Sequence, residues 1–156
     1  MRHTLSVLVQ NESGVLTKIS GLFSGRGFNI ESLTVAPTID TDFSKVTIIT
    51  TGDDKIIEQI CKQLNRLINV IKVIDVTGTN IAERELVLIK ISAKTDRSEI
   101  LNIASMFNAK IVDFTKKYCT LEVMGDEKTV KSFVELLKPL GIKELVRSGK
   151  VAISLD

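Results

Sequence analysis

Three residues, Asn11, Ser13 and Gly14, mark the segment of this chain that is best suited to holding a ligand. They lie where an apolar, strand-like run gives way to a helix-like pattern. The N–H groups in the first turn of a helix have no partner within that helix, and the helix dipole adds partial positive charge there. A carboxylate can bind at such a point. No acid–base machinery accompanies these residues, so they predict a site that holds a small ligand rather than one that converts it.

Two pairs of carboxylates and one histidine are the other titratable candidates. The pairs are Asp53 with Asp54 and Asp126 with Glu127, and each pair begins a predicted helix. Acidic side chains there cap the helix and favour its dipole, so capping is the interpretation that we adopt. His3 lies on a predicted strand, with no serine or cysteine nucleophile spaced around it in a recognisable motif. We therefore expect no catalytic residue in this chain.

The cysteines and the closely spaced glycines also lack the spacing of a reactive site. Cys61 and Cys119 stand far apart among apolar neighbours, without a C-x-x-C or H-x-x-x-H pattern. We expect buried free thiols, no disulfide and no metal site. Gly21, Gly25 and Gly27 do not form a G-x-G-x-x-G phosphate loop, because Gly21 lies inside a predicted helix and the others follow it. Their spacing is typical of a helix end.

Composition excludes several classes of protein. The chain has 156 residues, 44% hydrophobic and 26% charged, which suffices for one core or two small ones. Its 21 basic and 19 acidic residues give a net charge of only +2, and it has no Trp and one Tyr. A nucleic-acid partner is therefore not expected. The N-terminal apolar run is too short for a signal peptide, and no segment approaches the roughly 20 residues that span a bilayer. We expect a soluble protein with no membrane partner.

Hydrophobic periodicity predicts the same order of elements, βαββαβ, in each half of the chain. In the first half the helices carry the stripes 15–23 and 56–67, and the expected strands are 3–9, 30–36, 45–50 and 70–76. In the second half the expected helices are 96–107 and 126–138, and the expected strands are 86–92, 110–115, 119–124 and 142–153. The last strand is expected to be broken or bent around Ser148 and Gly149.

A weak internal repeat supports this division. Residues 51–64 align with 124–137, so that Gly52 corresponds to Gly125. Residues 19–23 align with 103–107 at a larger offset, which a longer first-half hairpin at 37–44 explains. The pattern predicts an α+β fold of two ferredoxin-like domains, 1–78 and 79–156, each an antiparallel sheet with its helices on one face. The uncovered face is semi-polar and the edge strands are long, so we expect oligomerisation through the sheets.

Several runs of the sequence resemble those of a known family. The runs LSVLVQNESGVL at 5–16, GLFS at 21–24 and GFNIESLTV at 27–35 resemble an ACT domain, the amino-acid-sensing module. Together with GDDK at 52–55, EQ at 58–59 and EREL at 83–86, they make the whole chain similar to the small regulatory subunits of acetolactate synthase (acetohydroxyacid synthase). The match includes polar residues that folding alone does not require.

The resemblance implies a non-catalytic subunit without a cofactor of its own. Its partner would be a large catalytic subunit, a transferase that uses thiamine diphosphate, Mg²⁺ and FAD. The small subunit would activate that enzyme and confer allosteric feedback inhibition by L-valine in branched-chain amino acid (valine, leucine and isoleucine) biosynthesis. It would form a homodimer through its ACT domains, with valine held between Asn11, Ser13, Gly14, Val15 and Leu16 of one subunit and Asn29 and Ile30 of the other.

The chemistry of these residues suits that role. N–H groups around Gly14 and Val15 would bind the carboxylate, the side-chain carbonyls of Asn11 and Asn29 the ammonium, and Leu16 with Ile30 the isopropyl group. In the second half Ser98 stands at the position of Gly14 and Lys110 at that of Asn29. We therefore expect valine sensing in the first half only, and association with the catalytic subunit in the second.

Some alternatives stay open at this point. Without the resemblance, Gly14 could serve only as a helix-entry residue and Asn11 only as a turn former. The chain could also be a stand-alone ACT-type regulator of a different enzyme. The preferred branched-chain effector is undecided, since one methylene in an apolar pocket is worth only about 1–3 kcal/mol. The lack of a leader fits a bacterial cytoplasm, or the plastid stroma for a plastid-encoded protein.

Overall fold

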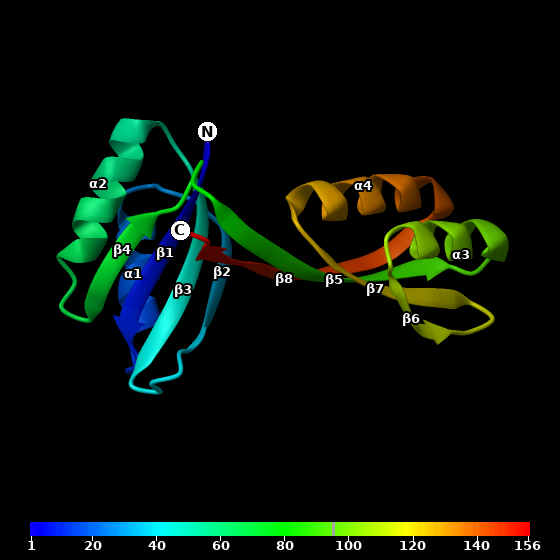
Figure 1. Cartoon of the computed structure of the whole chain (residues 1–156), viewed down its shortest axis with the longest axis horizontal. Helices are drawn as coiled ribbons and strands as arrows, with labels where there is room; N and C mark the ends of the chain where they lie inside the picture. The colour runs from blue at the N-terminus through cyan, green and yellow to red at the C-terminus, as the bar shows by residue number, and fades with distance from the viewer. Residues whose placement is uncertain (95) are drawn as a thin grey trace. The chain divides into compact units, whose positions relative to one another are not determined.

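The chain forms two compact units, each with its own hydrophobic core (Figure 1). The structure, a computed structural model, describes residues 1–94 and 96–156. The first unit comprises Met1–Ala82 and Lys150–Asp156, and the second comprises Glu83–Gly149. The expected ranges were 1–78 and 79–156. The compact units differ from them chiefly because the end of the last strand groups with the first unit.

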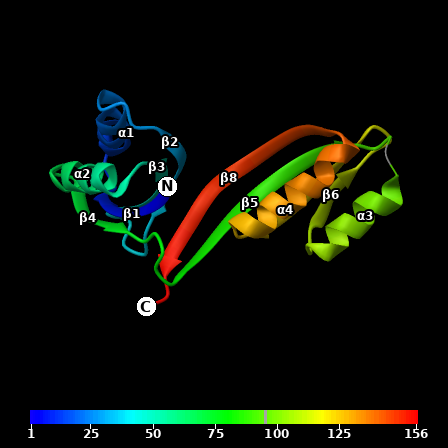
Figure 2. The same cartoon turned by 90° about the horizontal axis from the view of Figure 1, so that it is seen from above.

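The first unit is a four-stranded antiparallel sheet with two helices on one face, as Figures 1 and 2 show. The strand order is β2-β3-β1-β4, so β2 and β4 are the edge strands. The elements are β1 (Arg2–Gln10), α1 (Val15–Gly25), β2 (Ile30–Pro37), β3 (Phe43–Thr51), α2 (Asp54–Asn65) and β4 (Val70–Asp75). The predicted βαββαβ order is confirmed in this half.

The core of the first unit lies between this sheet and its two helices. Strand alternation puts Leu5 opposite Ile48 and Val7 opposite Val46, all four nearly fully buried. The apolar stripe of α1 packs onto them through Ile19, which has no exposed surface. Burial on this scale fixes the register, because a slip of one residue would turn every apolar side chain to the other face.

The other face of this sheet carries small polar side chains, as the sequence alternation predicted. Ser6 lies opposite Thr47, and both are buried. The end of β8 belongs to this unit, and the N–H of Lys150 donates to Ser32 Oγ on β2 at 3.4 Å. The N–H of Leu155 donates to a backbone carbonyl of the same unit at 2.8 Å. The C-terminal segment is thereby tied to the first unit.

The second unit repeats the design. Its elements are β5 (Ile81–Ser92), α3 (Arg97–Met106), β6 (Lys110–Phe114), β7 (Tyr118–Gly125), α4 (Glu127–Leu137), η1 (Lys138–Leu140) and β8 (Ile142–Ser154), and the strand order is β6-β7-β5-β8. Phe107 and Phe133 pack in its core with ring centroids 5.2 Å apart. The expected interruption of the last strand takes the form of a positive φ of 83° at Gly149, while β8 itself continues unbroken.

The glycine and aspartate shared by the two halves have the same structural role in each. Asp53 accepts a hydrogen bond from the N–H of Ile56 at 2.8 Å and caps α2, and Asp126 accepts one from the N–H of Thr129 at 2.8 Å and caps α4. A Cβ on Gly52 or Gly125 would approach Ile56 or Thr129 to 2.9 Å. Each glycine therefore makes room for the helix that follows, and the capping interpretation is confirmed.

The cysteines are free: Cys61 is half-buried and Cys119 is buried. Burial raises the pKa of both thiols, which is the opposite of what an activated nucleophile needs. Among residues 1–94 and 96–156 there is no cluster of three or more His, Cys, Asp or Glu side chains arranged to hold a metal ion. Within the same residues, no helix is both long and apolar enough to cross a membrane.

Candidate functional site

The junction between β1 and α1 leaves the start of a helix without a side-chain cap. Gly14 is the N-cap residue of α1 and makes no side-chain cap bond to the first turn. The first intrahelical bond runs from the N–H of Lys18 to the carbonyl of Gly14 at 3.1 Å, while the N–H of Val15 reaches the carbonyl of Glu12 only at 3.4 Å. The N–H groups between them have no intrahelical acceptor. They are the donors that a carboxylate would use.

Gly14 adopts a left-handed conformation, with φ 84° and ψ −6°. For residues other than glycine this backbone conformation costs roughly 1–2 kcal/mol of conformational free energy, least when the residue is Asn or Asp. A Cβ at Gly14 would have no heavy atom within 4 Å, so the constraint is conformational rather than steric. Gly14 therefore precedes the first turn of α1 and has a backbone conformation that glycine adopts readily. The glycine turns the chain into the helix.

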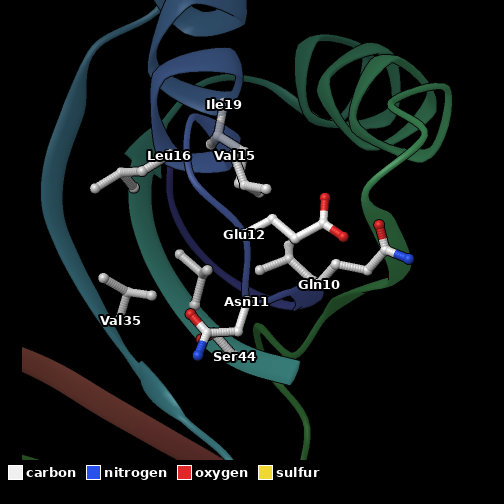
Figure 3. Close-up of a pocket in the computed structure, with 10 residues that line it drawn as sticks. Gln10, Asn11, Glu12, Val15, Leu16, Ile19, Val35 and Ser44 are labelled. Atoms are coloured by element: carbon white, nitrogen blue, oxygen red, sulfur yellow. The ribbon is translucent and has the colours of Figure 1, made fainter. Parts of the chain in front are cut away.

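A hollow of about 190 Å³ lies beside this helix end (Figure 3). Three of the seven predicted site residues line it, namely Asn11, Val15 and Leu16. The full lining is Val9, Gln10, Asn11, Glu12, Val15, Leu16, Ile19, Val35, Ser44 and Val46. Ser13 and Gly14 lie next to it in the β1–α1 loop without lining it.

Two apolar side chains face the hollow from different elements. Leu16 comes from the first turn of α1 and Val35 from the edge strand β2, and each is 42% exposed. Figure 3 shows them on the same side of the hollow, away from the polar ends of Gln10 and Glu12. Val35 was not predicted as a site residue. Only its pairing with Val46, a lining residue of β3, places it here, and that long-range register was the signal that sequence reasoning lacked.

The β1–α1 loop is held by hydrogen bonds at both of its sides. On one side the N–H of Asn11 donates to the carbonyl of Asp42 at 2.7 Å, and Asn11 Nδ2 donates to the carbonyl of Thr41 at 2.9 Å. Because Asn11 acts as donor in the second bond, its Oδ1 remains as an acceptor for an ammonium group. The loop is thus positioned with an acceptor at one end and the helix N–H groups at the other.

On the other side, the buried Asn69 forms hydrogen bonds with polar side chains from the end of β1, the loop and α1. Its Nδ2 donates to Gln10 Oε1 at 2.9 Å and to Glu12 Oε2 at 3.0 Å. Its Oδ1 accepts from Lys18 Nζ at 2.8 Å. The carboxylate of Glu12 is therefore fixed beside the hollow. Sequence reasoning missed this network because its members are far apart in the chain.

Asn29 and Ile30 lie elsewhere in a single chain. Both precede or begin β2, whereas Val35, the β2 residue of the hollow, is near the other end of that strand. Asn29 is exposed, and its carbonyl accepts from Thr50 Oγ1 at 2.7 Å. Ile30 packs at the margin of the core. The structure therefore brings together the loop residues of the predicted site but not the two strand residues.

His3 belongs to a separate cluster on β1, α2 and β4. Its Nδ1 lies 3.0 Å from Asp75 Oδ2, and its Nε2 lies 3.9 Å from Asp54 Oδ1. Burial would raise the pKa of Asp75, but hydrogen bonds from Thr77 and His3 outweigh it and hold that pKa below its usual value. Cys61 lines the same surface, with a thiol pKa raised by burial. The contact between His3 and Asp75 links β1 to β4, and this cluster lacks a reactive nucleophile.

Comparison with known proteins decides the family. A model described as the AHAS small subunit-like ACT domain matches residues 5–72, and one described as the small subunit of acetolactate synthase matches residues 84–156. A probable acetolactate synthase small subunit of Archaeoglobus fulgidus is 50% identical over 154 residues, covering 98% of this chain and 96% of the relative. The chain belongs to the acetolactate synthase small-subunit family.

Other relatives agree with this membership. The acetolactate synthase small subunit of Aquifex aeolicus is 47% identical, covering 97% of this chain and 80% of the relative. The crystal structure of the acetolactate synthase small subunit from Thermotoga maritima superposes with a TM-score of 0.89 at 38% identity, covering 99% of this chain and 97% of that one. The family's fold, with an ACT domain in the first half, is thus the fold seen here.

Proposed function

We propose that this small subunit binds L-valine at the β1–α1 hollow, activates the catalytic subunit of acetolactate synthase and makes that enzyme sensitive to valine. The catalytic partner, and not this chain, would carry thiamine diphosphate, Mg²⁺ and FAD. The observation that carries the proposal is the uncapped N-terminus of α1 beside an apolar wall. Ligand pockets for drug-sized molecules measure about 300–1,000 Å³, so a hollow of about 190 Å³ suits a smaller ligand such as an amino acid.

The helix that follows the first strand is α1 in the first unit and α3 in the second, and these two helices begin differently. The difference favours an effector site in the first unit. At α1 the N-cap is a glycine without a side-chain bond. At α3 the N-cap is Asp96, whose Oδ1 accepts from the N–H of Ser98 at 2.8 Å. A carboxylate from the chain itself already occupies the helix end in the second unit, and it would repel a ligand's carboxylate. This contrast supports a single effector site per chain.

Valine fits the remaining groups around the hollow. Its carboxylate would accept hydrogen bonds from the N–H groups in the first turn of α1. Its ammonium would donate to Asn11 Oδ1 and to the carboxylate of Glu12. Its isopropyl group would pack against Leu16 and Val35, which a free chain leaves partly exposed. The hollow is open to solvent and both of these side chains stay partly exposed, so one wall is still missing.

A second copy of the chain would supply that wall. Because β2 is an edge strand, two copies can pair their β2 strands antiparallel about a twofold axis. Antiparallel pairing puts the start of one β2 beside the end of the other. Asn29 and Ile30 of the second copy would then lie next to Val35, at the open side of the hollow. This is the homodimer through ACT domains, with one valine site at each end of the paired strands.

A mixing experiment tests the shared site. Asn11→Ala damages the loop half of the site and Asn29→Ala the strand half, so homodimers of either variant have two damaged sites. A mixed dimer has one site with both changes and one with neither. Calorimetric titration of the exchanged mixture should therefore recover valine binding at one site per mixed dimer, with threonine as the near-isosteric control. The shared site is wrong if subunit exchange is complete and no binding returns.

A further inference from the structure

Four lysines gather at one end of the sheet of the second unit. Lys94 follows β5, Lys116 and Lys117 lie in the turn between β6 and β7, and Lys143 is the second residue of β8. All four are exposed. Together with two neighbours they surround a hollow of about 290 Å³, whose lining is Ser92, Lys94, Lys116, Lys117, Tyr118 and Lys143. We call the four lysines the lysine cluster.

Backbone hydrogen bonds hold the cluster's strand ends together. The N–H of Ala93 donates to the carbonyl of Lys117 at 2.9 Å, and the N–H of Ser92 donates to the carbonyl of Gly141 at 3.1 Å. Thr115 Oγ1 accepts from the N–H of Lys117 at 3.2 Å and so fixes the turn. The strands involved, β7, β5 and β8, are neighbours in the sheet (Figure 1). The positive charges are therefore brought together by the fold and not by chance positions of a loose loop.

The lysine cluster has no ion-pair partner among the residues that the structure describes. Among residues 1–94 and 96–156 none of the four lysines forms an ion pair. Glu144, the acidic residue next to Lys143, is paired with Lys90 at 3.0 Å instead. Like charges held close together repel one another and create a local positive potential. Such a surface favours a negatively charged partner.

The surroundings favour an acidic protein surface over a small phosphate compound. Phosphate sites usually add free backbone N–H groups or arginine forks to their charge. Here the N–H groups of Ala93 and Lys117 are already bonded within the sheet end. The guanidinium of Arg97, the first residue of α3, lies over the ring of Phe114, 4.6 Å from its centroid. Long flexible ammonium groups without a rigid cradle suit several carboxylates spread over a surface.

We propose that the lysine cluster is a docking surface for an acidic surface of the catalytic subunit. This inference rests on the proposed function and adds to it the place and chemistry of the contact. The cluster lies in the unit whose helix N-terminus is closed to an effector by Asp96. Charged contacts of this kind speed association and select the partner, and salt weakens them, since charges are screened over about 8 Å at physiological ionic strength.

Charge reversal in the full-length chain tests the proposal. Lys116→Glu with Lys117→Glu reverses half of the cluster, and the matched control is Lys128→Glu with Lys131→Glu, exposed lysines on α4 of the same unit. We expect the first pair to weaken binding to the catalytic subunit at low salt by about tenfold or more, and the control by less than about twofold. Wild-type affinity should fall steeply with salt, and that slope should be shallower in the cluster variant. Thermal unfolding and valine titration check that each variant folds.

Three results would overturn the inference. Equal affinity of the cluster and control variants would show that the contact lies elsewhere. Competition by millimolar inorganic phosphate or diphosphate at constant ionic strength would assign the cluster to a small phosphate compound. Failure of the wild-type chain to bind the catalytic subunit at all would remove the proposed function and this inference together, whereas the first two results leave the proposed function standing. Lys94→Met with Lys143→Met repeats the test without adding negative charge.

Discussion

Replacing Gly14 separates the conformational role of this residue from its proposed place beside the carboxylate of a ligand. Gly14→Asp puts a carboxylate at the start of α1, and Gly14→Asn adds a neutral side chain of the same shape. Because φ is 84° and no atom lies within 4 Å of the new Cβ, both variants carry the same backbone strain and no clash. We expect each to lower the free energy of unfolding by about 1 kcal/mol, since Asn and Asp tolerate this backbone better than other residues.

The two variants should differ in valine binding by the charge alone. Two unit charges about 4 Å apart repel by about 4 kcal/mol at the effective dielectric near a protein surface. The helix end is open to solvent, so we expect about half of this, or roughly thirtyfold weaker binding for Asp than for Asn. Gly14→Asp should therefore abolish valine inhibition at concentrations that inhibit the wild type. Activation of the catalytic subunit should persist in both variants.

The assay is valine inhibition of the reconstituted enzyme, with thermal unfolding of each chain measured in parallel. Inhibition of Gly14→Asp at the same valine concentration as wild type would remove the β1–α1 loop from the site. Equal loss in Asp and Asn would mean that strain, and not repulsion of a ligand's carboxylate, explains the effect. Either result would contradict the carboxylate position on which the proposed function depends.

Two further predictions concern stability. The pKa of Asp75 is held below its usual value by hydrogen bonds from Thr77 and His3, so its stabilising effect is present above about pH 4 and is lost as the pH falls through the lowered pKa. The unfolding midpoint should therefore drop as the pH falls below about 4, and less steeply in Asp75→Asn. Phe133→Ala removes a fully buried ring from the second core and should cost that unit about 3–5 kcal/mol. Hydrogen exchange should then quicken in β7 while β1, in the other core, keeps its protection.

Local patterns of the sequence predicted the elements well, because each was set by residues close together in the chain. The repeated Gly-Asp pair at Gly52 and Gly125 predicted the start of a helix in both halves, and the structure gives both glycines the same close contact with the helix that follows. Helical stripes likewise identified Ile19 as a core residue, because a stripe is local. The βαββαβ order followed from these short-range signals.

The details of the candidate site depended on distant residues and could not be predicted in the same way. Val35 lines the hollow only through its register with Val46. The network around Asn69 joins β1, α1 and the start of β4. The left-handed backbone of Gly14 depends on how the chain enters α1, and glycine alone permits either sign of φ. Asn29 and Ile30 stay apart from the β1–α1 loop in one chain.

The return of Lys150–Asp156 to the first unit affects the order in which the chain can finish folding. A domain whose residues are contiguous can complete its contacts as soon as it has left the ribosome, and here that is the second unit, Glu83–Gly149. The first unit is synthesised earlier, yet the contact of β8 with Ser32 must wait for the last residues of the chain. The first unit is therefore the first to begin folding and the last to be complete, so a chain cut short during synthesis would lack its final strand contact.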